Sequence, residues 1–170
     1  DTGTDGEVLL TRNAEGYDGV EPSGNSSVAN VFLRLNSYGL ESEFFEDAQR
    51  IFRCFSPMFN QAGVSFCSML SGLHFSLLGP KEVVISGRRG DAETEALLSE
   101  VRREFHPNTV TAFLEDGNSK LSEEIIPLAS GRPMLNGRAT AYVCQNQACR
   151  LPVHTVEELR ELLDSSYFQN

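Results

Sequence analysis

The sequence has no tryptophan, no excess of basic residues and no long apolar run, and it is poor in histidine and cysteine. Its 14 lysines and arginines are outnumbered by 24 aspartates and glutamates. The net charge of −10 argues against a nucleic-acid-binding protein, which needs a basic face, and against binding to an anionic membrane. No segment has the length of a membrane span or the pattern of a signal peptide. We therefore expect a cytoplasmic protein with reduced thiols.

Apolar residues make up 40% of the 170 residues, which is enough for a packed core and too many for a disordered chain. This length allows one domain or two small ones. The sequence has no initial methionine, and its opening at 1–6 is polar and rich in glycine. Such an opening is typical of the interior of a longer polypeptide, so we expect a fragment.

Residues 1–79 predict a helical segment. After a polar stretch with one short turn or strand near 8–10, apolar stripes with a helical period predict three antiparallel helices. Their expected ranges are 27–38, 42–55 and 57–77. Gly39 is the expected C-cap of the first, Pro57 separates the second from the third, and a break is expected near Gly63. The expected buried stripe of the first helix is Val28, Val31, Phe32 and Leu35.

Residues 80–170 predict a small α/β unit. Short β-branched runs alternate with helical patterns, which is typical of parallel strands joined by covering helices. Strands are expected at 82–87, 109–114 and 139–144, and helices at 92–105, 120–128 and 155–163. Thr155, followed three residues later by Glu158, has the pattern of a capping box. The predicted fold class is therefore α plus α/β, with a three-stranded parallel sheet and flanking helices.

The polar stretch 17–27 precedes the first expected helix. Proline and glycine fix a tight loop there, and Asn25, Ser26 or Ser27 can cap the helix. The loop thus brings polar side chains to the positive end of a helix, where they could bind a polar ligand. A simple capped helix start is the alternative interpretation.

Two carboxylates in this loop are candidate catalytic groups. Asp18 or Glu21 could serve as a general acid, a general base or an acceptor for a sugar-like hydroxyl. Ser23, Asn25 and Ser26 are the candidate ligand-binding residues. Glycoside chemistry generally needs a second carboxylate across the scissile bond, and the sequence does not identify that partner.

Cys144 and Cys149 follow the third expected strand and are the candidate redox pair. They could form a disulfide around the short turn, although free packed thiols are favoured in a cytoplasm. A zinc site would need two further ligands, and only His154 is near. Cys54 and Cys67 fall on apolar helical faces and are expected in the core. Neither a metal nor a cofactor is predicted, because the stretch at 83–90 also lacks the glycine pattern of a nucleotide-binding loop.

Three stretches together resemble one family. They are DGVEPSGNS at 18–26; PKEVVISG at 80–87 with PN at 107–108; and TAYVCQNQAC at 140–149 with PV at 152–153 and EEL at 157–159. They are similar to motifs of the YyaL-type, or spermatogenesis-associated, thioredoxin-domain-containing proteins. Val20 departs from the small residue of that pattern, and Gln147 stands where bacterial members often have an aromatic. Neither departure changes the polar motif.

The resemblance implies a thioredoxin-like domain followed by an (α/α)6 toroid similar to N-acylglucosamine 2-epimerases and six-hairpin glycosidases. This chain would be the C-terminal portion, with the last toroid hairpins at 1–79 and the α/β unit at 80–170. In such toroids the cavity lies at the ends of the inner helices, so the loop would line it. The expected partners are a sugar ligand and the rest of the parent chain. The alternatives are a non-catalytic scaffold for the thioredoxin domain, and a purely structural interaction domain.

Overall fold

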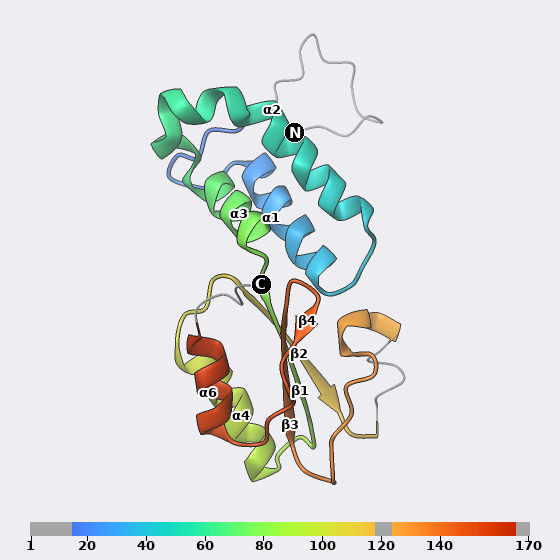
Figure 1. Ribbon diagram of the computed structural model, residues 1–170. Coiled ribbons are helices and arrows are strands. Elements are labelled where there is room, and N and C mark those ends of the chain that lie inside the picture. Colours follow the sequence, from blue (N-terminus) through green and yellow to red (C-terminus); the bar gives the residue numbers. More distant parts are fainter. Residues whose placement is uncertain (1–14, 118–123, 166–170) are drawn as a thin grey trace. The chain divides into compact units, whose positions relative to one another are not determined.

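The computed structural model describes residues 15–117 and 124–165 (Figure 1). The chain divides into two compact units. The helical unit contains residues 15–36 and 41–77, and the α/β unit contains residues 37–40 and 78–165. The turn or strand expected near 8–10 lies outside the described residues.

The helical unit contains the three expected helices with shifted ends. Its elements are α1 (Gly24–Ser37), α2 (Glu43–Ala62), the 3-10 turn η1 (Gly63–Phe66) and α3 (Cys67–Leu78). Gly39 has a left-handed φ of 81° just beyond α1, as expected for a glycine that ends a helix. The expected break near Gly63 is confirmed by η1, which begins at that residue.

Pro57 does not separate two helices, and that prediction is wrong. It lies inside α2, which continues to Ala62. The ring of Phe66 is 6.2 Å from the ring of Phe55 and 5.5 Å from the ring of Phe59. These contacts lie on both sides of Pro57, and we infer that they offset the hydrogen bond that a proline removes from a helix.

The buried stripe of α1 also differs from the expected one. Val28 and Val31 are 41% and 52% exposed. The helical unit instead buries the smaller stripe of α1, namely Ser26, Ala29 and Leu33. Close approach explains this choice, because Asn30 donates to the carbonyl of Ser68 in α3 and its side chain lies against Gly72. Small residues allow such an approach, whereas valines would hold the helices apart.

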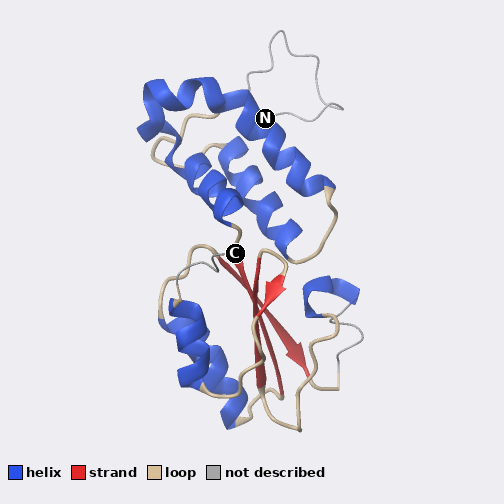
Figure 2. Cartoon of the chain, viewed as in Figure 1, coloured by secondary structure: helices blue, strands red, loops and turns tan. Residues whose placement is uncertain are grey.

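The α/β unit contains a four-stranded mixed sheet (Figure 2). Its elements are β1 (Lys81–Gly87), α4 (Ala92–Arg103), β2 (Thr109–Glu115), the 3-10 turn η2 (Pro127–Ala129), β3 (Thr140–Gln145), β4 (Ala148–Cys149) and α6 (Val156–Asp164). The strand order is β2-β1-β3-β4. Strand β1 is parallel to β2 and antiparallel to β3, and β3 is antiparallel to β4.

The predicted three-stranded parallel sheet is therefore wrong in strand number and direction. Between β2 and β3 we expected a helix at 120–128 that would return the chain for a parallel strand. The beginning of that range lies outside the described residues, and its end forms η2. Strand β3 then runs antiparallel to β1. This direction depends on how the connecting segment returns the chain to the sheet, and the residues of β3 alone do not predict it. Strand β4 was missed because it is only two residues long.

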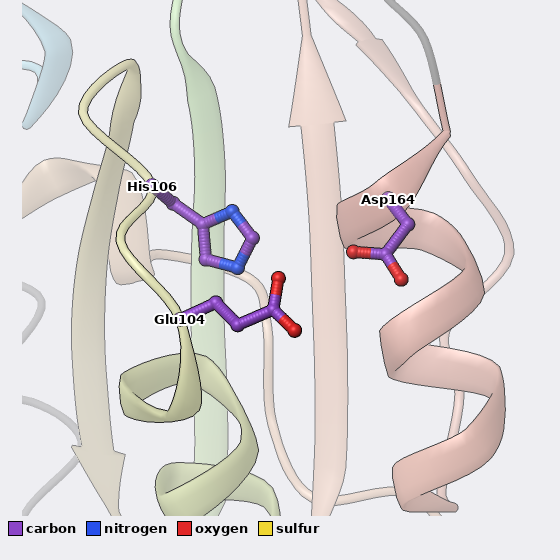
Figure 3. A group of neighbouring side chains, drawn as sticks. All are labelled: Glu104, His106 and Asp164. Atoms are coloured by element: carbon purple, nitrogen blue, oxygen red, sulfur yellow. The ribbon is translucent and has the colours of Figure 1, made fainter.

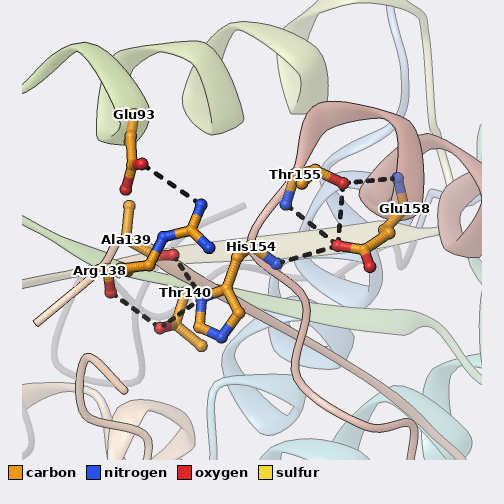
Figure 4. Close-up of polar contacts among 7 residues, drawn as sticks. All are labelled: Glu93, Arg138, Ala139, Thr140, His154, Thr155 and Glu158. Atoms are coloured by element: carbon orange, nitrogen blue, oxygen red, sulfur yellow. Dashed lines mark hydrogen bonds and ion pairs between the residues drawn. The ribbon is translucent and has the colours of Figure 1, made fainter. Parts of the chain in front are cut away.

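Helices α4 and α6 cover one face of the sheet and enclose its main core (Figures 1 and 2). The buried members of this core are Val83, Ile85, Leu97, Leu98, Ala139, Ala141, Val143, Leu159 and Leu163. The capping box at the start of α6 is confirmed (Figure 4). The Thr155 hydroxyl accepts from the backbone N–H of Glu158 at 3.3 Å, and the Glu158 carboxylate accepts from the N–H of Thr155 at 3.2 Å. This reciprocal pair satisfies helix donors that would otherwise lack partners.

Candidate functional site

Asp18 fastens the polar loop to the start of α3. One carboxylate oxygen accepts from the N–H of Ser23 at 2.9 Å. The other accepts from the N–H groups of Ser68 at 2.8 Å and Met69 at 3.2 Å. The N–H of Asp18 itself donates to the carbonyl of Ser65 at 2.7 Å. Because the first N–H groups of a helix lack partners within it, Asp18 acts as a helix cap supplied from a distant loop.

These hydrogen bonds keep Asp18 ionised. Burial by itself raises the pKa of Asp18, but the Ser26 hydroxyl and the N–H groups of Ser23, Met69 and Ser68 together bring the pKa below its ordinary value. An ionised carboxylate whose two oxygens already accept hydrogen bonds is well suited to hold the loop in one conformation.

The other polar residues of the loop also bind the loop itself. The Ser23 hydroxyl accepts from the N–H of Ser26 at 3.1 Å and donates to the Ser26 hydroxyl at 2.8 Å. Ser23 is therefore the cap of α1, and the prediction that the cap is Asn25, Ser26 or Ser27 was wrong. The Asn25 amide donates to the carbonyl of Glu15 at 2.8 Å. The cap lies earlier than expected because α1 already begins at Gly24.

Glu21 lies at the surface of this loop. Its carbonyl accepts from the N–H of Gly19 at 3.1 Å, so its backbone position is fixed. Val20 beside it is fully exposed. The loop thus presents the Glu21 carboxylate and the side chains of Tyr17 and Val20 outward, while Asp18, Ser23 and Asn25 hold it from within. An acid or base role of Glu21 stays a prediction.

The structure joins Cys144 and Cys149 in a disulfide, with an S–S distance of 2.09 Å. The expectation of free thiols is thereby overturned, because the antiparallel pairing of β3 and β4 places these two residues directly opposite each other. Cys54 and Cys67 are exposed, which contradicts their predicted core positions. Helix α2 buries Ala48, Phe52 and Phe55 instead, and α3 buries Met69, Gly72 and Phe75.

Arg132 is a neighbour of the disulfide that the sequence did not reveal. One terminal guanidinium nitrogen lies 3.4 Å from Cys144 Sγ and 3.8 Å from Cys149 Sγ. The other terminal nitrogen donates to the carbonyl of Leu128, and the carbonyl of Arg132 accepts from the Ser86 hydroxyl. A fixed positive charge beside two sulfurs would stabilise a thiolate there. Arg132 lies twelve residues before Cys144 on an irregular segment, so no periodic signal connects them.

His154, the third ligand considered for zinc, lies in a separate set of polar contacts (Figure 4). Its Nδ1 is 2.9 Å from the carbonyl oxygen of Ala139 and 3.4 Å from the hydroxyl of Thr140. The backbone N–H of His154 donates to the Glu158 carboxylate at 3.3 Å. His154 therefore contacts the start of β3 through its ring and the start of α6 through its backbone.

Glu104, His106 and Asp164 converge between the end of α4 and the end of α6 (Figure 3). One potential ligand atom from each lies within 4.8 Å of the others. Beside them is a cleft of about 270 Å³, lined in part by Lys81 and His106. This donor set could bind a divalent cation. The buried ammonium group of Lys81 in the same cleft would repel such a cation.

Lys81 caps the C-terminal end of α6 at this cleft. Its ammonium group donates to the carbonyls of Leu162, Leu163 and Ser165 at 3.0, 2.5 and 2.6 Å. Burial lowers the pKa of Lys81, and the nearby carboxylate of Asp164 partly opposes this shift. All three ammonium donors are used on helix carbonyls, which is the favourable position for a cation at a helix end.

Within residues 15–117 and 124–165, no helix is long and apolar enough to cross a membrane.

The chain is similar to part of several larger proteins. It is 32% identical over 158 residues to human spermatogenesis-associated protein 20, and 31% identical over the same length to the mouse protein. It is 30% identical over 165 residues to an uncharacterized protein of Caenorhabditis elegans. These matches cover 93% of this chain but only 20% to 21% of each relative. No family model and no solved structure matches the chain. The homology supports the family resemblance carried by the three sequence motifs.

Proposed function

We propose that this chain is the C-terminal part of a larger protein related to spermatogenesis-associated protein 20, and that its helical unit completes a helical toroid that binds or processes a carbohydrate. The match to relatives of which the chain spans about a fifth supports a larger parent protein, and the C-terminal position follows from the family resemblance alone. The resemblance to epimerase and glycosidase toroids is the basis for the carbohydrate. A cytoplasmic location belongs to the same proposal.

The outward stripe of α1 is the observation that carries this proposal. Val28 and Val31 are about half exposed, and Tyr17 and Val20 at the preceding loop are 58% and 106% exposed. Apolar side chains gathered at one helix and its adjoining loop are typical of a surface that another part of the protein covers. The occupant we propose is the remainder of the parent polypeptide, because most of the length of the relatives lies outside the matched part. Adjacent toroid helices would pack on this stripe.

Within the toroid, the polar loop would lie at the N-terminal end of α1. In such toroids the ligand cavity opens at the ends of the inner helices. Asp18 would position the loop through its bonds to Ser23 and to the start of α3. Glu21, held at the loop surface by a fixed backbone, would face the ligand as a general acid, a general base or a hydroxyl acceptor. The buried hydroxyls of Ser23 and Ser26 would keep the loop in shape, and the half-buried Asn25 would offer its side-chain oxygen to the ligand.

The test uses the full natural polypeptide and a panel of N-acylated amino sugars, aldoses and small glycosides, with products followed by NMR. We expect turnover of one class, and we expect Glu21→Gln to lower kcat by about 100-fold or more, the usual contribution of a general acid or base. Glu15→Gln is the matched control, because Glu15 is an exposed carboxylate just before the loop and the bond that its backbone carbonyl accepts from Asn25 is retained in the variant. Equal activity of Glu21→Gln and Glu15→Gln would reject the role of Glu21.

A second candidate function is a non-catalytic scaffold for a thiol-redox domain elsewhere in the parent protein. The disulfide of Cys144 and Cys149, with the guanidinium of Arg132 beside it, favours this candidate. If this candidate is correct, none of the sugars in the panel would be turned over, while added thiols would reduce the disulfide of Cys144 and Cys149.

A further inference from the structure

The two sulfurs of the disulfide differ in accessibility. Strand β4 is the edge strand of the described sheet, in the order β2-β1-β3-β4. Cys149 on this edge is exposed, whereas Cys144 on β3 is only 1% exposed. A thiolate arriving from solvent would therefore reach the sulfur of Cys149, and the sulfur of Cys144 would be the leaving group. Thiol–disulfide exchange depends on this kind of access.

Arg132 favours departure of the Cys144 sulfur. A buried thiolate is normally disfavoured because burial penalises charge. Here the guanidinium lies 3.4 Å from Cys144 Sγ and is held in place by the carbonyl of Leu128. A neighbouring cation lowers the pKa of a thiol, and a thiol of lower pKa leaves faster in exchange. Glu82, paired with Cys144 across β1 and β3, opposes a negative charge there; burial raises the pKa of Glu82, and the nearby guanidinium of Arg132 partly opposes this rise.

The hairpin that the disulfide closes has an unfavourable turn. Both connecting residues have left-handed backbones, with φ of 50° at Asn146 and 64° at Gln147. Asparagine adopts this region with little penalty, whereas glutamine does so rarely, and two-residue hairpins usually place glycine there. The turn therefore holds β4 against β3 less well than a turn with glycine at the position of Gln147 would, and the disulfide and the backbone pairing of the two strands supply the remaining constraint.

The same hairpin contacts the segment that leads into β1. The Gln145 amide donates to the carbonyl of Gly79 at 2.8 Å. The Asn146 side chain packs so closely on Gly79 that a Cβ there would lie 2.0 Å from Asn146 Oδ1. Opening of the hairpin would therefore loosen the contacts that hold Gly79.

We infer that Cys144 and Cys149 form a thiol–disulfide exchange site whose substrate is a protein dithiol of the thioredoxin type. A thiolate of the dithiol attacks Cys149 Sγ, a mixed disulfide forms, and the electron pair of the broken S–S bond stays on Cys144 Sγ beside Arg132. The second thiolate of the dithiol then attacks the dithiol sulfur that is bonded to Cys149, and the sulfur of Cys149 is released as the leaving group. Two electrons and two protons pass to the pair, and the dithiol becomes a disulfide. This site is independent of the carbohydrate proposal.

The first test is a trapping experiment on the full natural polypeptide. The probe is thioredoxin with its second active-site cysteine replaced by serine, which cannot complete the exchange. We expect a mixed disulfide that peptide mass spectrometry places on Cys149. Trapping on Cys144, or no trapping while the pair remains oxidised, would overturn the inference. The exposed thiols of Cys54 and Cys67 serve as internal references for alkylation.

The second test measures the rate at which intact thioredoxin reduces the pair, with reduced glutathione as the competing monothiol. We expect thioredoxin to be the faster reductant, Arg132→Gln to slow reduction by about tenfold, and Arg132→Lys to slow it less. Arg138→Gln is the matched control, because Arg138 pairs with Glu93 and not with the disulfide. Hydrogen exchange at the backbone amide of Arg150, which donates to the carbonyl of Val143 across the hairpin, should increase on reduction. Equal rates for the Arg132→Gln and Arg138→Gln variants, or faster reduction by glutathione, would overturn the inference.

Discussion

Replacement of Asp18 by asparagine tests the most specific structural role in the helical unit. The carboxylate accepts three backbone N–H bonds, two of them from the first turn of α3. Loss of a helix cap costs about 0.5 to 2 kcal/mol, and a hydrogen bond to a charged group contributes about 1.5 to 3 kcal/mol. Because Asp18 is half-buried and the bonds share one carboxylate, we expect Asp18→Asn to lower the free energy of unfolding by about 2 kcal/mol.

The assay combines urea denaturation with hydrogen exchange, which separates local from global effects. In the Asp18→Asn variant, the amides of Ser68 and Met69 should lose protection more than amides in β1. The pKa of Asp18 is lower in the folded protein than its ordinary value of 3.8. The stability that the ionised Asp18 carboxylate contributes is therefore fully present above pH 3.8. It is lost as the pH falls through the lower pKa of Asp18 in the folded protein.

Glu21→Gln is the matched control for stability, because Glu21 is an exposed carboxylate on the same loop. We expect its free energy of unfolding to equal that of the parent protein. The proposed role of Asp18 would be refuted if Asp18→Asn were as stable as the parent, or if Glu21→Gln were equally destabilised.

Two further predictions concern the α/β unit. Glu100 accepts from Arg160 at 2.9 Å through both oxygens, and these bonds, with those from Arg103, hold the pKa of Glu100 at about 2. Glu100→Gln should lower the unfolding free energy by about 1 kcal/mol at neutral pH, since its arginine partners are partly exposed. In urea denaturation, the difference in unfolding free energy between the parent and Glu100→Gln should shrink as the pH falls from 4.5 toward 2. A difference that does not change with pH would contradict the stabilising role of the Glu100 carboxylate. Leu97→Ala should cost about 2 to 5 kcal/mol in the same assay, because Leu97 is 1% exposed in the main core; a loss below about 1 kcal/mol would contradict this packing.

The sequence predicted local elements well because their signals are local. Helix α6 follows from its apolar period and the pair Thr155 and Glu158, and β1 follows from its β-branched run. The burial of α1 could not be predicted in the same way. The helix has an apolar stripe that includes Val28 and a smaller stripe that includes Ala29, and only the neighbouring α3 decides which is buried.

The features that were missed depend on contacts between distant residues. The sequence indicated that Asp18 could be chemically important, but its partners Ser68 and Met69 lie fifty residues away. The direction of β3 depends on the path of the chain after β2, and no residue within β3 records that path. Arg132 approaches the disulfide from an irregular segment. Local sequence patterns pointed to the loop and the cysteine pair as candidates, but they carry no information on Ser68, Met69 and Arg132, which the fold brings beside them.

A crystal structure of the full natural polypeptide would test the central claim most directly. We predict that helices outside this chain pack on Val28 and Val31 of α1, and that the Glu21 carboxylate lines the cavity of the resulting toroid. A structure in which this stripe and Glu21 both lie on the outer surface of the whole protein would contradict the account.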